Sequence, residues 1–346
     1  MILLYIVLLI IPIVITVAFY TLAERKIIAS IQRRTGPNVV GFWGALQPFA
    51  DGLKAILKEQ IRPLRAVFYL FLFAPILTFL LSLISLNFIC FTFTRSYFDE
   101  YLNFFFFLSI SSFNVFGIIL AGWTSNSKYT LIGSLRAAAQ VFSFEMCFIT
   151  LLLPIFLLNG TFNLIDIVLY QNNYWNCFVF LPTTIYFFII ILAETNRTPF
   201  DLPEAEAELV AGYNLEYSAI NFALFFLGEY TNMLLNSCIF VIFFFGGWFI
   251  PDFLFIFGNL DTTFYNVMFF IKTIFVACMF IVVRAILPRY RFDQLMDICW
   301  KKILPVSCSF FLFFIFNIYL FDGFFFNLEL LSLQPSSSLV LYYKFT

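Results

Sequence analysis

Long runs without charged residues divide the chain into hydrophobic segments. Seven runs lack Asp, Glu, Lys and Arg altogether: 1–23, 66–94, 101–127, 146–165, 167–193, 230–251 and 303–321. About 20 apolar residues are enough for a helix to cross the roughly 30 Å hydrocarbon core of a bilayer. With the polar stretches between them, the runs predict eight membrane-spanning helices, near 2–22, 68–93, 101–123, 138–158, 177–194, 218–248, 265–286 and 303–322.

The predicted fold is an all-α integral membrane protein, with a single polytopic domain over 1–322 and a tail over 323–346. Composition agrees, because 62% of the residues are hydrophobic and 11% are charged, whereas a soluble domain has roughly 25% charged residues. A membrane β-barrel is excluded, because its strands alternate apolar and polar residues over about 10 positions. Runs such as 240–245 are apolar on every face.

Basic residues gather on one side of this topology. Because eight is an even number, both chain ends lie on the same side of the membrane. The other side receives the connections 23–66, 124–137, 195–217 and 287–302, which together with Arg284 hold 16 of the 19 Lys and Arg residues. Positively charged connections remain on the cytoplasmic or matrix side. We therefore expect these connections inside, and both termini and the tail outside.

The first inside connection contains an amphipathic segment. Apolar residues recur there at three- and four-residue steps and so share one helix face, whereas polar residues lie off it. The apolar residues are Phe42, Leu46, Phe49, Leu53, Ile56 and Leu57, and the polar ones are Gln47, Asp51, Lys54, Lys58 and Glu59. The pattern predicts a helix lying at the membrane surface. Its role as an anchor or as the wall of a site remains open.

Acidic residues cluster in and beside the third inside connection. Between Ala193 and Tyr230, seven acids stand against the single base Arg197: Glu194, Asp201, Glu204, Glu206, Glu208, Glu216 and Glu229. Another acid, Glu145, interrupts an apolar segment. An ionised residue inside a membrane costs about 2.5–3.5 kcal/mol on insertion scales and usually faces a protein interior or a hydrated cavity. A line of such carboxylates can pass protons, although a solvated acidic loop is the alternative.

Basic residues on the inside face have several possible partners. They comprise Arg25, Arg33, Arg34, Lys54, Arg284, Arg289 and Arg291, and they suit anionic lipid headgroups, an acidic protein or the polar head of an amphipathic ligand. The chain has no histidine, and no two of its 7 cysteines are spaced as C-x-x-C. Zinc and iron–sulfur sites therefore lack a ligand set, and a haem with two histidine ligands is impossible.

Several motifs resemble one protein family. They are AERK at 23–26, QRRTGPN at 32–38, LQPFADGLK at 46–54, GSLRAAAQ at 133–140, AETNRTPFDLPEAEAEL at 193–209 and LPRYRFDQLM at 287–296. Their order resembles that of membrane subunit 1 of respiratory complex I, the NADH:ubiquinone oxidoreductase, and that of its bacterial counterpart. The resemblance covers about 1–322 and departs from the family at 95–100 and in the tail. The family shares the eight-helix topology.

The resemblance implies a subunit that is catalytic only within its assembly. It would form the ubiquinone-reduction chamber with a peripheral iron–sulfur subunit and couple quinone reduction to proton translocation. Arg25, Arg34, Asp51, Lys54, Arg197, Phe226, Arg284 and Arg289 would line the chamber and its mouth. Glu145, Glu194, Asp201, Glu204, Glu206, Glu208, Glu216 and Glu229 would form the coupling path. Ubiquinone would be the substrate, this chain would hold no metal, haem or flavin, and FMN and iron–sulfur clusters would reside in partner subunits.

Location and partners follow from composition and resemblance together. The 54 phenylalanines are explained by the codon bias of an AT-rich organellar genome, and the N-terminus carries no Arg-rich presequence. We expect an organelle-encoded protein of the mitochondrial inner membrane, with both termini in the intermembrane space. Its partners would be other complex I subunits, among them small membrane subunits, and lipids such as cardiolipin, with no nucleic acid.

Two other functions use the same features. A self-contained ion-coupled transporter would use the acidic line as its cation path, although the chain shows no internal repeat of the kind such transporters contain. The homologous subunit of a membrane-bound hydrogenase or of a plastid dehydrogenase shares many of the motifs. A copurifying nickel–iron centre or a ferredoxin requirement would distinguish these two enzymes.

Overall fold

The computed structural model describes residues 2–89, 102–172, 174–201, 212–250 and 262–320. Within these ranges the chain forms helices and connecting loops, with no β-strand. Each of the eight expected segments overlaps a helix: α1 (Ile2–Ile31), α3 (Phe68–Leu86), α4 (Asn103–Thr124), α5 (Lys128–Asn159), α8 (Leu181–Glu194), α10 (Ala219–Phe244), α11 (Thr262–Ile286) and α13 (Leu304–Leu320).

Six of the described helical stretches are long and apolar enough to cross a membrane. They are α3, α4, α5, α10, residues 263–286 of α11, and the stretch Phe292–Asn317, in which α12 (Phe292–Asp297) and the π-helical η4 (Ile298–Ile303) lead into α13. The helix α8 is also apolar but is shorter than these six stretches. The structure thus confirms the all-α membrane fold.

Several helix boundaries differ from the expectation: α1 continues to Ile31 instead of ending near 22, and α3 ends at Leu86 instead of near 93. Two further differences have a local cause. The helix α5 begins at Lys128 rather than near 138, because the Ser127 side chain accepts a hydrogen bond from the Thr130 N–H and caps the polar first turns. The segment expected over 177–194 breaks at Phe180, which has φ −112° and ψ 42°. It forms the single turn α7 (Asn176–Val179) and the helix α8.

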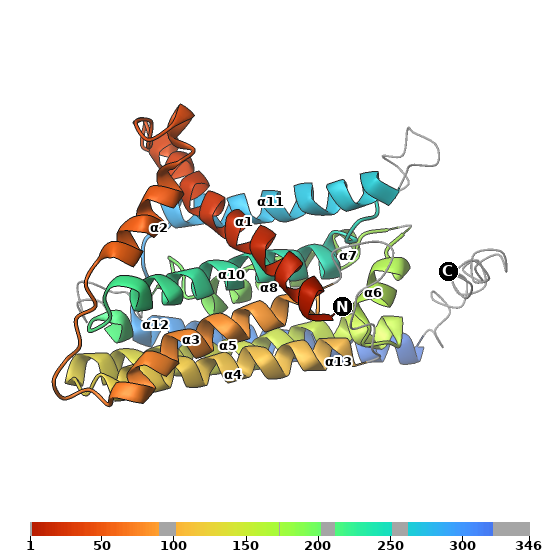
Figure 1. Ribbon diagram of the computed structural model, residues 1–346. Helices are drawn as coiled ribbons and strands as arrows, with labels where there is room; N and C mark the ends of the chain where they lie inside the picture. The colour runs from red at the N-terminus through yellow and green to blue at the C-terminus, as the bar shows by residue number, and fades with distance from the viewer. Residues whose placement is uncertain (1, 90–101, 173, 202–211, 251–261, 321–346) are drawn as a thin grey trace.

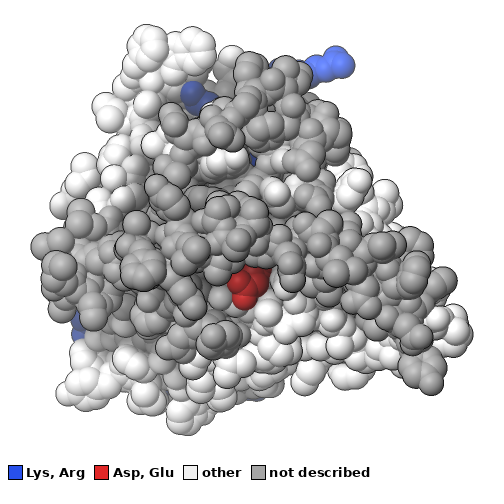
Figure 2. Space-filling view, turned by 90° about the vertical axis from the view of Figure 1, so that its right-hand side faces the viewer, with Lys and Arg blue, Asp and Glu red and all other residues white. Residues whose placement is uncertain are grey.

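Most of the helices run side by side in one bundle, and α1 crosses it obliquely to contact α10 and α11 (Figure 1). The first turns of α1 and the last turn of α13 lie at one end of the bundle, whereas α2 (Gln47–Leu57) and α12 lie at the other. This arrangement agrees with an even number of crossings. In Figure 2, which looks onto the first of these ends, the described surface is mostly uncharged, with one acidic spot near the centre and a few basic side chains at the upper and left edges.

Phenylalanine rings pack the interior between α4, α5, α8 and α10. The ring of Phe104 lies 4.6 Å from that of Phe156 and 5.5 Å from that of Phe243, and Phe148 lies 5.0 Å from Phe187. All are buried. Contacts between aromatic rings at such distances stabilise a core beyond the area that they bury. Part of the high phenylalanine content therefore serves packing.

A buried lysine closes the end of α10. Lys272 of α11 is 9% exposed, and its ammonium donates hydrogen bonds of 2.8, 2.8 and 2.6 Å to the carbonyls of Phe245, Gly247 and Phe249. The same nitrogen lies 4.5 Å from the centre of the Trp175 ring. These three carbonyls follow Phe244, the last residue of α10, so the ammonium fastens the turn after α10 to α11.

A close glycine contact positions the chain before α10. A Cβ atom on Gly133 of α5 would lie 2.8 Å from Cα of Gly212, at the start of the short helix η2 (Gly212–Asn214). The backbones can approach this closely only because neither residue has a side chain. The contact holds Tyr213, the next residue, against the bundle.

Candidate functional site

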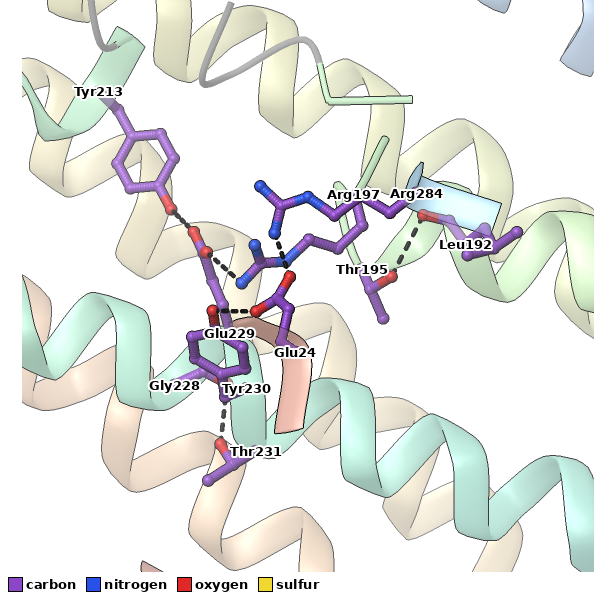
Figure 3. A network of polar contacts seen from close by, with 10 residues as sticks. All are labelled: Glu24, Leu192, Thr195, Arg197, Tyr213, Gly228, Glu229, Tyr230, Thr231 and Arg284. Atoms are coloured by element: carbon purple, nitrogen blue, oxygen red, sulfur yellow. Dashed lines mark hydrogen bonds and ion pairs between the residues drawn. The ribbon is translucent and has the colours of Figure 1, made fainter. Parts of the chain in front are cut away.

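Figure 3 shows a carboxylate that joins three helices of the bundle. Glu24 of α1 is 6% exposed and forms an ion pair with the guanidinium of Arg284 on α11. The hydroxyl of Tyr230 on α10 donates a hydrogen bond of 2.5 Å to the other carboxylate oxygen. Glu24 therefore links α1 to α10 and to α11, although Arg284 is 260 positions away along the chain.

Glu229, which directly precedes Tyr230 on α10, binds the other residues of this network. Its carboxylate accepts a hydrogen bond of 2.6 Å from the hydroxyl of Tyr213 and lies 3.7 Å from Nη2 of Arg197. Arg197 is 4% exposed, and its Cζ atom lies 4.6 Å from the centre of the Tyr230 ring, a cation–π contact. Two carboxylates thus face two guanidinium groups, and this balance offsets the cost of burying the charges.

The connection after α8 is held by a glutamine of α5. The side-chain amide of Gln140, which is fully buried, donates hydrogen bonds of 2.8 Å to the carbonyl of Ala193 and 2.9 Å to that of Phe200. These two carbonyls stand on either side of Arg197. A single side chain therefore fixes both ends of the loop that brings Arg197 into the network.

The same loop ends in a second ion pair. Asp201 is 3% exposed, and its Oδ2 lies 3.3 Å from Nη2 of Arg289. The Tyr290 N–H donates a hydrogen bond of 3.0 Å to the carbonyl of Pro199, and the Tyr290 ring stacks on Phe200 at 5.6 Å between centroids. The segments that follow α8 and α11 are therefore joined by charge, by backbone and by aromatic packing.

A polar cavity lies beside the network, between α3, α4, α5, the end of α8 and α10. Glu194 and Glu229 are part of its wall. It offers about 60 Å³ to the centres of water molecules, whereas one water needs about 10–15 Å³ by this measure. The uncharged polar residues of the wall include Ser82, Ser111, Asn114, Asn232 and Asn236.

Several buried polar atoms of this wall lack a hydrogen-bond partner within the described part of the chain. They are Oε2 of Glu194 and the side-chain oxygens of Asn114, Asn196 and Asn236. Buried polar groups are nearly always hydrogen-bonded to protein or to ordered water. The cavity has room for several waters, and Glu194 and Glu229 both lie in its wall.

A fourth ion pair lies at the surface between α1 and α2. Nη1 of Arg25 is 2.7 Å from Oδ2 of Asp51, with side-chain exposures of 51% and 40%. The apolar residues of α2 point away from the bundle, with Ile56 63% and Leu57 83% exposed. The predicted amphipathic surface helix is confirmed. Its exposed apolar face borders a charged pair.

The remaining predicted site residues lie apart from the network or outside the described ranges. Arg34 is exposed and donates a hydrogen bond to Gln32, and Lys54 is an exposed residue of α2. Half-buried positions are occupied by Glu145 on α5, Glu216 before α10, and Phe226, which packs on Phe222 at 4.5 Å. The residues Glu204, Glu206 and Glu208 lie outside the described residues.

Four residues of the site were not assigned from the sequence. Glu24 stands beside Arg25 and Lys26 and looks like part of a basic connection. Tyr213 and Tyr230 give no signal in a chain with 22% aromatic residues. Gln140 closes a motif used for the family resemblance, but its hydrogen bonds reach a segment more than 50 positions away.

In the described ranges, no three His, Cys, Asp or Glu side chains converge as metal ligands would. The polar groups of the site are carboxylates, guanidinium groups, phenols and amides, which exchange protons and bind anions or polar carbonyl groups. The absence of a resident metal or cofactor in this chain remains a prediction.

Comparison with known proteins finds one matching family model and several similar proteins. The family model described as NADH dehydrogenase matches residues 4–315. The NADH-ubiquinone oxidoreductase chain 1 of Cyanidium caldarium is 50% identical over 300 residues, which cover 87% of this chain and 86% of the relative. The Arabidopsis thaliana chain 1 is 49% identical, with coverages of 87% and 91%. A bacterial relative, an NADH-quinone oxidoreductase subunit of Rickettsia typhi, is 48% identical, with coverages of 86% and 87%.

Proposed function

Because the chain belongs to the NADH dehydrogenase family, we propose that it is the core membrane subunit of a proton-pumping NADH:ubiquinone oxidoreductase. In this proposal it builds the quinone-reduction chamber with a peripheral iron–sulfur subunit and couples the reaction to proton translocation. The observation that carries the proposal is the charge-balanced network beside a polar cavity that Glu229 shares with Glu194. FMN and the iron–sulfur clusters belong to the partner subunits.

The chamber residues would be those with cationic or aromatic groups near the inside face. A quinone has a long apolar tail and a polar head, so it needs an apolar surface next to hydrogen-bond donors. The exposed apolar face of α2 beside Arg25 and Asp51 supports such a surface. We assign Arg25, Arg34, Asp51 and Lys54 to the chamber and its mouth, and Arg197, Phe226, Arg284 and Arg289 to its inner wall.

The coupling path would begin at the network. Quinone reduction takes up two electrons and two protons, so the charge near the head changes during the reaction. A negative charge that develops on the quinone head attracts the guanidinium of Arg284 and weakens the ion pair between Arg284 and Glu24. Tyr230, which bonds Glu24 and touches Arg197, would pass this change to Glu229. Waters in the cavity would then extend the path to Glu194.

The other acids complete this assignment. We propose that Glu145, Glu194, Asp201, Glu204, Glu206, Glu208, Glu216 and Glu229 form the proton and electrostatic path. We further place residues 1–322 in one domain of the mitochondrial inner membrane, with both termini in the intermembrane space. Small membrane subunits and anionic lipids such as cardiolipin would cover its outer surface.

The proposal is tested by Glu194→Gln in membranes that contain the assembled enzyme. The change keeps the size of the side chain and removes its exchangeable proton. We expect NADH:quinone turnover to fall about tenfold or more, while NADH oxidation by a hydrophilic artificial acceptor continues. Glu59→Gln is the matched control, because Glu59 is an exposed carboxylate after α2.

A native gel stained for NADH dehydrogenase activity verifies assembly of each variant. Equal loss of both activities in a fully assembled Glu194→Gln enzyme would refute the coupling role. Migration of the unmodified chain as a small free oligomer in active membranes would refute membership of the large assembly.

A further inference from the structure

Two buried cysteines from distant parts of the chain lie in contact. Cys147 is in the middle of α5 and Cys299 is in η4, and their Sγ atoms are 3.5 Å apart. Neither residue is exposed. Either thiol can donate the weak hydrogen bond that joins them. The two residues are 152 positions apart, so only the packing of η4 against α5 brings them together.

Contacts on both sides of the pair keep it in register. The hydroxyls of Thr150 and Ser307 are 2.8 Å apart, on the side toward α13. On the side toward α12, the hydroxyl of Ser143 lies 3.8 Å from Sδ of Met296. These contacts prevent α5 and the η4 segment from sliding past one another. The two sulfurs are therefore held as neighbours.

The two sulfurs lie at van der Waals contact distance. A disulfide has its sulfurs about 2.05 Å apart, so these sulfurs would have to approach by about 1.5 Å. The residues Ile298–Ile303 around Cys299 form a π-helical turn. Such turns are rare, occur mostly as single-turn bulges inside α-helices and are frequent at functional sites. A side-chain rotation together with a small adjustment of this turn can supply the approach.

We propose that Cys147 and Cys299 are a modification site, which forms a reversible disulfide when the assembled protein meets a two-electron oxidant such as hydrogen peroxide. This inference is independent of the proposed function. The two cysteines belong to different helices, and the disulfide would tie η4 to α5. Through η4 it would also restrain the segment that carries Arg289, the partner of Asp201.

The reaction balances with one peroxide. The sulfur of one cysteine, as its thiolate, attacks a peroxide oxygen; the O–O bond breaks, a sulfenic acid forms, and the leaving hydroxide takes up the thiol proton as water. The second sulfur then attacks the sulfenic sulfur. The S–O bond breaks, and the leaving oxygen takes up the second thiol proton and departs as water. Two thiols are oxidised by two electrons in all, and one peroxide becomes two waters.

The test uses membranes that contain the full assembly. They are treated with hydrogen peroxide, denatured in a maleimide that blocks free thiols, digested and analysed by mass spectrometry. We expect a linked peptide pair that contains Cys147 and Cys299, together with an equal loss of maleimide label from both. Dithiothreitol should restore the label.

Two variants make the outcome specific. Cys299→Ser should abolish the linked pair, whereas Cys238→Ser should leave it unchanged, because Cys238 is also buried but lies on α10. The proposal is overturned if Cys147 and Cys299 remain fully labelled at every peroxide concentration that leaves the assembly intact. Linkage of Cys147 to Cys308 in place of Cys299 would overturn it equally.

Discussion

Replacing Glu24 by glutamine tests how strongly one side chain holds α1, α10 and α11 together. The amide has nearly the same shape as the carboxylate but carries no charge. It leaves Arg284 without its anion and turns the short hydrogen bond from Tyr230 into a neutral one. The perturbation is therefore electrostatic and changes little in packing.

The expected size of the effect follows from burial. Breaking a buried ion pair costs about 3–5 kcal/mol, and a hydrogen bond to a charged group contributes about 1.5–3 kcal/mol. The Glu24 side chain is 8% exposed, but that of Arg284 is 29% exposed, so water recovers part of the loss. We expect about 2–3 kcal/mol of lost stabilisation in this three-helix contact; where quinone reduction requires the contact intact, the same free energy corresponds to at most about a 30- to 150-fold loss of kcat/KM for quinone.

The assay compares quinone reduction with reduction of a hydrophilic acceptor in membranes that contain the variant assembly. A double-mutant cycle with Tyr230→Phe separates the shared interaction from the individual effects. We expect the two changes to be less than additive by about 1 kcal/mol, because residues in direct contact couple by 0.5–3 kcal/mol. Strict additivity, or normal quinone kinetics in Glu24→Gln, would refute the role of Glu24 as a positioning residue.

Three further changes test other parts of the structure. Asp51→Asn should alter the quinone KM more than the rate with a hydrophilic acceptor; an unchanged dependence on quinone concentration and chain length would favour a mere surface anchor. Gly133→Ala should lower the thermal inactivation temperature, because overpacking against Gly212 costs about 1–3 kcal/mol, whereas Gly52→Ala, with open space at its Cβ position, should not. Lys272→Met should also lower the thermal inactivation temperature, since it leaves three carbonyls without a hydrogen-bond donor. Lys272→Arg should recover part of the lost thermal stability.

Much of the fold was predictable because a membrane imposes simple requirements on the sequence. Charge-free runs locate the bundle helices other than α11, which is interrupted by Lys272, since an ionised group in lipid is costly. The start of α5 was not predictable from hydrophobicity, because its first turns contain Gly133, Ser134 and Arg136 and pack on other parts of the protein. The break at Phe180 was missed for the opposite reason, since both sides of it are apolar.

The site was partly predictable for reasons that differ among its residues. Glu229, Arg197 and Arg284 were assigned because a charged residue in or beside an apolar segment stands out. Tyr230 and Gln140 were not assigned, because their role depends on which distant groups they meet. Charge can be recognised in a sequence, whereas a hydrogen-bond partner is determined only by tertiary packing.

The long separation between Glu24 and Arg284 has a consequence for the order of synthesis. At about 5–20 residues per second, roughly 10–50 s pass between the addition of Glu24 and that of its partner 260 positions later. Throughout this interval the Glu24 carboxylate has no Arg284 to bind. The 30 residues of α1 give a helix of about 45 Å, which is longer than the roughly 30 Å core. A helix of this length can place Glu24 among lipid headgroups and water until α11 is inserted beside α1.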